Sequence, residues 1–302
     1  MKNKIKQFNI FVFLYLFFIS TAISEEIKFE ANSIELIDKD KKIIAKKNVK
    51  IFNETETIFA DEIDYDKSKN IVTGKGNIVL EKLDEKIKVF SEELIYLKNT
   101  EIIILDKSVK IELDEKFLFS AKKVTYDKNK NKIDISDKFK FIDNLGNEIS
   151  SKKAVFLFNK KLIKLKSVKM IDNLNNNYSF ENAIFDFGTN EMIADDVKID
   201  FSKKSFGNDE NDPRLRGNYM YGSNNKSLVK KGVFTTCKKE KDKCPPWQFK
   251  AEEIMHDKNK KTIYYKNAWL EIYDKPVIYF PRFFHPDPTV KRQSGFLIPK
   301  FE

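Results

Sequence analysis

The sequence repeats a strand-like motif at intervals of 29 to 36 residues, and this repeat limits the folds open to the chain. Each copy places a polar or small residue before alternating apolar and polar positions, as in KNVKIF from residue 47 and KSVKIEL from residue 107. A regular period of this length indicates an array of stacked structural units. The first apolar residues of the copies are Val49, Ile78, Val109, Phe139, Val168, Val197, Val233 and Ala268.

A second motif falls between these copies, as in FADEIDYD from residue 59 and FSEELIYL from residue 90. Stretches such as DKSKN and DKNKN have the composition of tight turns. Apolar residues alternate with charged ones at the period of a β-strand, which places residues such as Val109 and Ile111 on one face. One unit cannot bury that face alone, whereas stacked units can. The sequence therefore predicts an all-β, elongated roll of about eight stacked hairpin units, with an apolar interior and a charged exterior.

The repeated pattern A-x-x-I-x-Y-D…G-x-V-x-I resembles the OstA-type β-jellyroll (β-taco) of periplasmic lipopolysaccharide-transport proteins. Residues 231–299 more closely resemble the junction segment of the LptD family of outer-membrane lipopolysaccharide-assembly proteins. In that family an S-G-F-L-x-P segment leads into the first strand of a large transmembrane β-barrel, and this sequence supplies one such strand at most. The residues that carry the resemblance are Thr235, Thr236, Cys237, Trp247, Ala251, Glu253, Asp257, Pro276, Val277, Tyr279, Pro281, Arg292, Ser294, Gly295, Phe296, Leu297 and Pro299.

The N-terminus predicts export. Three lysines precede an apolar run of ten residues, and small residues follow at the expected cleavage site after Ser24, so residues 1–24 are interpreted as a signal peptide. Together with export, the resemblance implies a location at the periplasmic face of the outer membrane. Without the rest of the barrel, the chain is expected to be a fragment, a truncated gene product or one half of a split protein.

The remaining chain is expected to have three segments. Residues 25–201 form the periplasmic OstA-like jellyroll, and residues 202–275 continue it, with a cysteine-containing insertion, toward the barrel junction. Residues 276–302 form a connector rich in proline and aromatic residues, followed by the start of the barrel. Because proline removes hydrogen-bond donors from a sheet, we interpret this connector as rigid and outside the sheet.

The resemblance implies a role in lipopolysaccharide transport and outer-membrane assembly. It implies that the apolar interior carries the acyl chains of lipid A from a periplasmic bridge to the outer-membrane translocon. Each buried methylene would contribute about 0.8 kcal/mol without any specific polar contact. The expected lipid-binding residues are Val49, Ile51, Ile78, Val109, Ile111, Phe139, Phe141, Val168, Met170, Val197 and Ile199.

Two protein partners follow from the resemblance. An open edge is expected at the N-terminal strand, around Ile27, Phe29 and Ala31, where a periplasmic jellyroll protein of the LptA type adds a strand. A lipoprotein plug of the LptE type would bind the barrel. No nucleic-acid partner is expected for an exported chain. The net charge of +10 gives little support to an anionic partner, because an AT-rich genome also produces a lysine-rich composition.

No catalytic, cofactor or metal site is expected. The sequence has two histidines, His256 and His285, and it has neither a G-x-S-x-G elbow nor a phosphate-binding loop. His256 occupies the strand position that Tyr65 and Tyr126 hold in other units, which favours a structural role. The chain is therefore not expected to be an enzyme.

Cys237 and Cys244 are the two cysteines, and an oxidising periplasm favours disulfides. Their spacing permits a local bridge, while the resemblance implies bridges to cysteines near the end of the barrel. Two alternative functions also remain open. One is a free-standing periplasmic lipopolysaccharide carrier of the same fold, and the other is a β-solenoid structural or adhesive protein with a closed core.

Overall fold

The computed structural model describes residues 28–39, 41–52, 56–82, 86–113, 117–142, 146–186, 188–203, 211–239, 245–286 and 290. The predicted signal peptide lies outside these residues. Strands make up most of the described chain. The described residues include one short 3-10 helix, η1 (Phe158–Lys160), and no α-helix. The all-β prediction is confirmed. Within the described ranges, no helix has the length and apolar character needed to cross a membrane.

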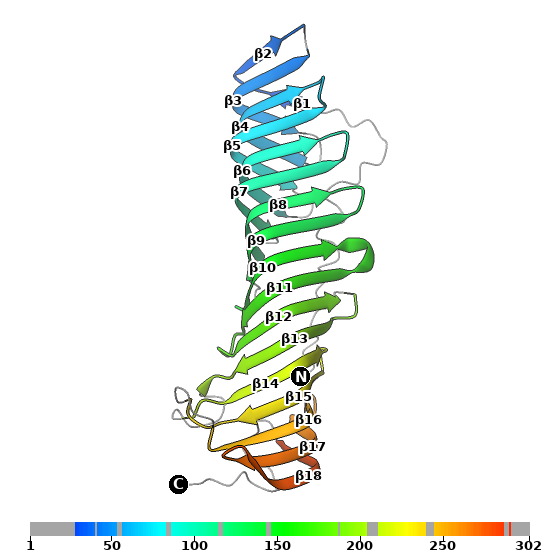
Figure 1. Cartoon of the computed structure of the whole chain (residues 1–302). Helices are drawn as coiled ribbons and strands as arrows, with labels where there is room; N and C mark the ends of the chain where they lie inside the picture. The colour runs from blue at the N-terminus through cyan, green and yellow to red at the C-terminus, as the bar shows by residue number, and fades with distance from the viewer. Residues whose placement is uncertain are drawn as a thin grey trace. The chain divides into compact units, whose positions relative to one another are not determined.

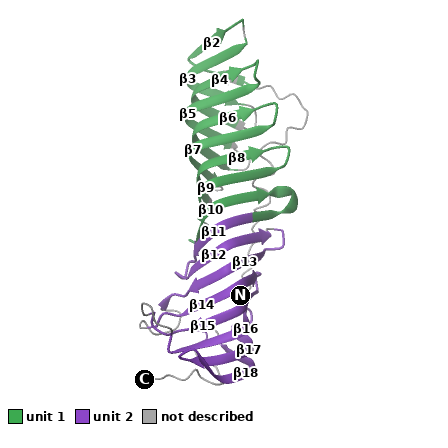
Figure 2. Ribbon diagram, in the orientation of Figure 1, with its two compact units in different colours: residues 1–163 green, residues 164–302 purple. Residues whose placement is uncertain are grey.

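The first compact unit, residues 1–163, is a stack of antiparallel strands, shown in green in Figure 2. Its strands are β1 (Lys28–Glu30), β2 (Ser33–Ile37), β3 (Lys42–Phe52), β4 (Glu56–Asp66), β5 (Ile71–Lys82), β6 (Ile87–Leu97), β7 (Ile102–Leu113), β8 (Phe117–Asp127), β9 (Lys132–Ile142) and β10 (Glu148–Leu157). From β3 to β10 each strand pairs with the next one, so the hairpins follow one another in chain order (Figure 1). β2 pairs with the first half of β3, and β1 pairs with its second half.

Each odd-numbered strand from β3 to β9 turns a corner near its middle. In β3, Lys47 and Asn48 have φ values of 63° and 52°, and the register with β4 shifts between Lys46 and Val49. A β-bulge of this kind bends the strand. The corresponding pairs with positive φ are Gly76 and Asn77, Lys107 and Ser108, and Asp137 and Lys138. The polar or small residues before each copy of the repeat are therefore the corner of a long strand and not its beginning.

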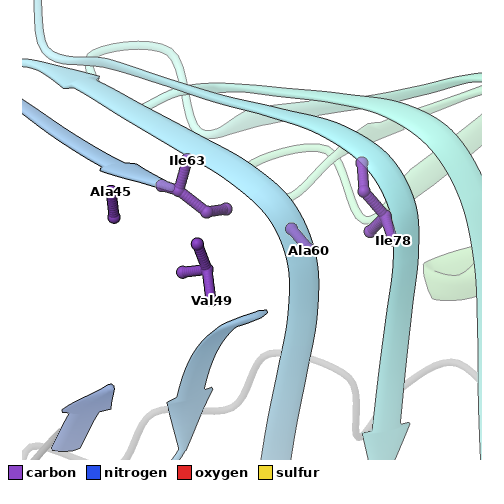
Figure 3. Close-up of a cluster of buried hydrophobic side chains, with 5 residues drawn as sticks. All are labelled: Ala45, Val49, Ala60, Ile63 and Ile78. Carbon is purple, nitrogen blue, oxygen red and sulfur yellow. The ribbon is translucent and has the colours of Figure 1, made fainter. Parts of the chain in front are cut away.

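The apolar residue after each corner is buried on the inside of the bend. Val49, Ile78 and Val109 are 1%, 2% and 1% exposed. Figure 3 shows the ribbons bending at Ala60 and Ile78, with Val49 and Ile63 inside. Each corner residue pairs with a small residue on the next strand, which leaves room for the two halves of the strand to approach each other. The pairs are Val49 with Ala60, Ile78 with Ser91, Val109 with Ala121, and Phe139 with Ser151.

The corners divide the first unit into two half-sheets that share its strands. One, called here the tyrosine half-sheet, contains the row of paired residues Ile43, Tyr65, Val72, Tyr96, Ile103, Tyr126, Ile133 and Phe156. Its deeper row is Ala45, Ile63, Gly74, Leu94, Leu105, Val124, Ile135 and Ala154. The opposite half-sheet contains the row Ile51, Ile58, Leu80, Val89, Ile111, Phe119, Phe141 and Ile149.

The second compact unit, residues 164–302, is shown in purple in Figure 2. The division falls within β11 (Leu162–Ile171), most of which belongs to the second unit. The other strands of this unit are β12 (Asn177–Asp186), β13 (Glu191–Asp200), β14 (Arg214–Gly222), β15 (Lys226–Thr235), β16 (Trp247–Asp257), β17 (Thr262–Ile272) and β18 (Lys275–Pro286). From β12 to β18 each strand again pairs antiparallel with the next. The division after Ile163 falls inside the segment 25–201, and the segment boundaries expected from the sequence remain a prediction.

In β15 the buried corner residue lies one position before Val233, the first apolar residue of that repeat copy. Gly232 follows Lys231, whose φ is 50°, and pairs with Ala251. Val233 instead pairs with Lys250 and is only half-buried. A Cβ added at Gly232 would lie 2.5 Å from Cδ1 of Ile254, so close packing requires glycine there. The residue buried at this corner is therefore Gly232, one position before the first apolar residue of the repeat copy.

The proline-rich segment is a strand, so its interpretation as a connector outside the sheet is wrong. β18 pairs with β17 from the Lys275–Ile272 pair to the Pro286–Thr262 pair. Within the described residues β18 has one paired edge, and proline is tolerated on an edge strand because its missing donor can face away from the partner. Residues 287–289 and 291–302, which include the expected start of the barrel, lie outside the described residues.

Candidate functional site

An apolar cavity of about 250 Å³ lies between the two half-sheets of the first unit. The tyrosine half-sheet contributes Ile63, Val72, Gly74, Leu94, Tyr96, Ile103, Leu105, Val124, Tyr126 and Ile133 to its lining, and the opposite half-sheet contributes Ile51, Ile58, Leu80, Val89 and Ile111. Ile78 at the corner and Lys128 complete it. An apolar cavity of about 150 Å³ already takes up a molecule the size of benzene. The larger cavity here therefore has room for part of an alkyl chain.

The cavity follows directly from strand alternation. Residues two apart on a strand point to the same face, so Leu94 and Tyr96 on β6 both line the cavity, as do Leu105 and Ile103 on β7. The same spacing recurs on neighbouring strands, and the paired rows join into a continuous apolar surface. Such a lining can bind a chain by excluding water, without polar contacts.

The rim of the cavity is polar at Tyr96. Its ring lines the cavity, and its hydroxyl donates a hydrogen bond to Oε2 of Glu101 at 2.8 Å. Burial raises the pKa of Tyr96 to about 12. Lys128, on the next hairpin, forms an ion pair with Glu101 at 2.9 Å, and this contact lowers the pKa of Glu101. The apolar lining thus ends at a tyrosine, a lysine and a glutamate.

Equivalent tyrosines mark the same rim on the neighbouring hairpins. Tyr126 lines the cavity and donates a hydrogen bond to Oδ1 of Asn131 at 3.3 Å. Tyr65 accepts a hydrogen bond from Nζ of Lys98 at 3.2 Å. A tyrosine suits such a boundary because its ring is apolar and its hydroxyl reaches water or a polar partner.

A family model described as "LptA/(LptD N-terminal domain) LPS transport protein" matches residues 28–132. Those residues contain β1 to β8 and most of the cavity lining. Residues 28–132 form an LptD_N-type domain. The family is one of transport proteins, which agrees with the expectation that the chain is not an enzyme.

Individual relatives match a shorter part of the chain. The LPS-assembly protein LptD of Francisella tularensis subsp. novicida (strain U112) is 44% identical over 55 residues, which are 18% of this chain and 6% of that protein. LptD of F. tularensis subsp. holarctica (strain OSU18) has the same identity and coverage. Among solved structures, LptH of Pseudomonas aeruginosa, titled the LptA homologous periplasmic component of the lipopolysaccharide transport device, is 18% identical with a TM-score of 0.33. That match covers 37% of this chain and 82% of LptH.

Within the LptD_N-type domain, some of the predicted lipid-binding residues line the cavity and others are buried at the strand corners. Ile51, Ile78 and Ile111 line the cavity. Val49 and Val109 are almost completely buried in the corners. Two predicted aromatic residues lie on β9, beyond the end of the matched segment at residue 132. Phe139 is buried and Phe141 is half-buried, with its ring centroid 4.7 Å from that of Phe119.

Four predicted lipid-binding residues lie in the second unit. Val168, Val197 and Ile199 are buried, and Met170 is half-buried. None of the four lines the cavity of the LptD_N-type domain. Their role in lipid binding stays a prediction.

Most of the cavity lining was not predicted from the sequence. The predicted lipid-binding residues lie on the strand halves that follow each corner, whereas the tyrosine half-sheet supplies the larger share of the lining, including Leu94, Leu105 and Val124. The signal was present in the second motif. In FSEELIYL, Leu94 and Tyr96 stand two apart, the spacing of residues on one face of a strand.

The predicted partner edge falls on the first strands. Ile27 lies outside the described residues, the backbone of Phe29 pairs with Ile51, and Ala31 packs against the core around Val49. Of the described strands, β2 pairs only with β3, and its side chains are exposed throughout. Its apolar residues Ile34, Leu36 and Ile37 are 52%, 60% and 43% exposed.

The two cysteines are only partly described. Cys237 is half-buried, and its backbone carbonyl accepts a hydrogen bond from the guanidinium of Arg214 at 2.6 Å. Cys244 lies outside the described residues, so the disulfide remains a prediction. No group of histidine, cysteine and acidic residues suited to a metal ion occurs among the residues with described positions.

Proposed function

We propose that the chain takes part in lipopolysaccharide transport and that the cavity of the LptD_N-type domain holds lipid A acyl chains during transfer. The observation that supports this most strongly is the cavity itself, an apolar space between half-sheets where a closed core would have side chains. The family description and the names of the relatives point to the same process. A structural or adhesive solenoid has no use for an internal cavity.

The energetics suit a carrier. Each methylene that moves from water into the cavity contributes about 0.8 kcal/mol, and this contribution does not depend on a particular hydrogen-bond partner. A chain can therefore move along the lining from one hairpin to the next without breaking a specific polar contact. The repeated rows of Ile, Leu and Val provide equivalent positions along such a path.

The proposed partners follow from the edges of the domain. An LptA-type protein would add its strand at β1 or β2, because an exposed edge offers unpaired backbone groups. The exposed Ile34 and Leu36 would become buried in that contact. We further propose that the chain acts at the periplasmic face of the outer membrane, with an LptE-type protein as part of the assembly.

The proposal is tested by filling the cavity. Val72→Trp places a large ring in the lining, and Thr73→Trp, one residue later and on the other face of β5, is the matched control. We expect purified Val72→Trp to remain folded and to lose most of its lipopolysaccharide binding, while Thr73→Trp binds like the unmodified chain. Unchanged binding by a folded Val72→Trp variant would refute a role for the cavity and favour the structural alternative.

A further inference from the structure

The cavity rim marked by Tyr65, Tyr96 and Tyr126 carries a lysine on each of two successive hairpins. Each of these lysines lies near the ring of the tyrosine on the preceding hairpin. Lys98 follows Tyr96 by two residues, and its Nζ lies 5.0 Å from the ring centroid of Tyr65 on the preceding hairpin. Lys128 follows Tyr126 by two residues, and its Nζ lies 5.8 Å from the ring centroid of Tyr96. Both distances fall within the range of a cation–π contact. Each ammonium group is thus held at the boundary of the apolar row.

These lysines set the charge where the cavity opens. Among the residues with described positions, Lys128 is the one charged side chain that lines the cavity. Lys98 contacts the hydroxyl of Tyr65, and Lys128 shares its charge with the carboxylate of Glu101. In the adjoining turns Lys69 and Lys130 form ion pairs with Asp66 and Asp127, so these two lysines add no net charge to the rim. An apolar space that ends at fixed cations is complementary to a molecule with an apolar chain and an anionic head.

We propose that Lys98 and Lys128 form a headgroup subsite that binds a phosphate or another anionic group of the amphiphile whose chain occupies the cavity. This inference rests on the proposed function, because it requires a chain in the cavity. An exposed lysine alone binds an anion weakly. A chain held in the cavity raises the effective concentration of its headgroup at the rim, so the two weak contacts become useful.

Glu101 allows the proposal to predict the direction of a change in binding affinity. Its carboxylate accepts the hydrogen bond of Tyr96 and pairs with Lys128, so it positions the lysine at the rim. The same carboxylate repels an incoming anion and competes with it for the ammonium group. Replacing Glu101 by glutamine keeps the shape of the side chain and removes the competing charge. Loss of this acidic residue should therefore strengthen the binding of an anionic amphiphile.

The test compares two probes with the same chain and different heads, dodecyl phosphate and the neutral dodecyl maltoside, on the purified chain. The double variant Lys98→Ala/Lys128→Ala should bind dodecyl phosphate about tenfold more weakly, because each exposed charge contact contributes about threefold. Because Lys128 also lines the cavity, the readout is the ratio of the two affinities, and binding of dodecyl maltoside should fall much less than binding of dodecyl phosphate. Glu101→Gln should bind dodecyl phosphate about threefold more tightly. Lys98→Arg/Lys128→Arg should retain binding, since the charges remain.

The matched control is Lys110→Ala/Lys122→Ala, which removes two exposed lysines from the outer face of β7 and β8 and should affect neither probe. An equal loss of both probes in the rim variant, or no loss of dodecyl phosphate, would overturn the subsite while leaving chain binding in place. Failure of the unmodified chain to bind dodecyl maltoside would instead refute the cavity function. Inorganic phosphate should not displace dodecyl phosphate, and tight binding of phosphate alone would show that the chain is not required.

Discussion

The hydroxyl of Tyr265 donates a hydrogen bond to Nε2 of His285 across 3.0 Å, and both side chains are buried inside the second unit. Nδ1 of His285 donates to the carbonyl of Pro286, 2.7 Å away, which leaves Nε2 as the acceptor. The rings of Phe249 and Phe283 stack beside this pair, with centroids 5.5 Å apart. Aromatic side chains therefore fill this part of the second unit and hold the edge strand β18 in place.

Removal of the Tyr265 hydroxyl should weaken the second unit. Tyr265→Phe keeps the ring and loses the hydrogen bond to His285, so the free energy of unfolding should fall by about 1 kcal/mol. Tyr273→Phe is the control, because that side chain is 70% exposed, and its stability should be unchanged. Denaturant unfolding of both variants measures the difference. Equal stability of the two variants would mean that the buried hydrogen bond contributes nothing.

Alkaline pH should destabilise the fold through its buried tyrosines. Burial raises the pKa of Tyr96 to about 12, and burial also raises the pKa of Tyr265. In the unfolded chain tyrosine ionises near pH 10, so ionisation favours unfolding once the pH exceeds about 10. Stability from these groups is complete below that pH and is lost as the pH rises through the folded-state pKa values. Denaturant midpoints between about pH 8 and pH 11 should fall, and less steeply in Tyr96→Phe. A flat profile would contradict the assignment.

Gly232 should tolerate replacement by alanine poorly. Gly232→Ala brings a methyl group 2.5 Å from Cδ1 of Ile254, and overpacking of this kind costs about 1 to 3 kcal/mol. Gly222→Ala is the matched control on β14, because its new methyl group would meet atoms no closer than 3.7 Å. Thermal unfolding should show a lower midpoint for Gly232→Ala alone. A similar midpoint for both variants would show that the corner has room to relax.

A buried charge should distinguish the cavity from the corner. Leu94 lines the cavity and is half-buried, so the carboxylate of Leu94→Glu can reach water, and the variant should fold while losing lipopolysaccharide binding. Val109 is 1% exposed, so Val109→Glu should unfold the domain, because an unpaired buried charge is very costly. Circular dichroism and a binding assay measure the two effects. A folded Val109→Glu variant, or an unfolded Leu94→Glu variant, would contradict this division.

The repeat was sufficient to predict the all-β stack, because period-two alternation and regular spacing leave few other ways to bury apolar side chains. It was not sufficient to place the corners. Lys47 and Asn48 look like a turn before a strand, yet a bulge with positive φ carries the strand through them. Sequence alternation shows a change of face at such a point but not whether the chain reverses or bends.

The same ambiguity explains the partial prediction of the site. Ile51 and Ile111 were predicted from alternation and line the cavity, whereas Leu94 and Val124 belong to the tyrosine half-sheet, in which no lipid-binding residue was predicted. Only pairing across the corner shows that both halves of a strand face one interior. The prediction that Pro276 and Pro281 lie outside the sheet was wrong for a different reason. The sequence does not show that β18 has one paired edge among the described strands, where proline is tolerated.

The most direct test of the account is site-specific photo-crosslinking in cells during lipopolysaccharide transport, with the probe at Ile111 or at its neighbour Lys110 on β7. Ile111 lines the cavity, while Lys110 is exposed on the other face of the strand. Lipid transport through the cavity predicts lipopolysaccharide adducts from Ile111 and none from Lys110. Adducts from Lys110 alone, or none from either position in a functional protein, would contradict it.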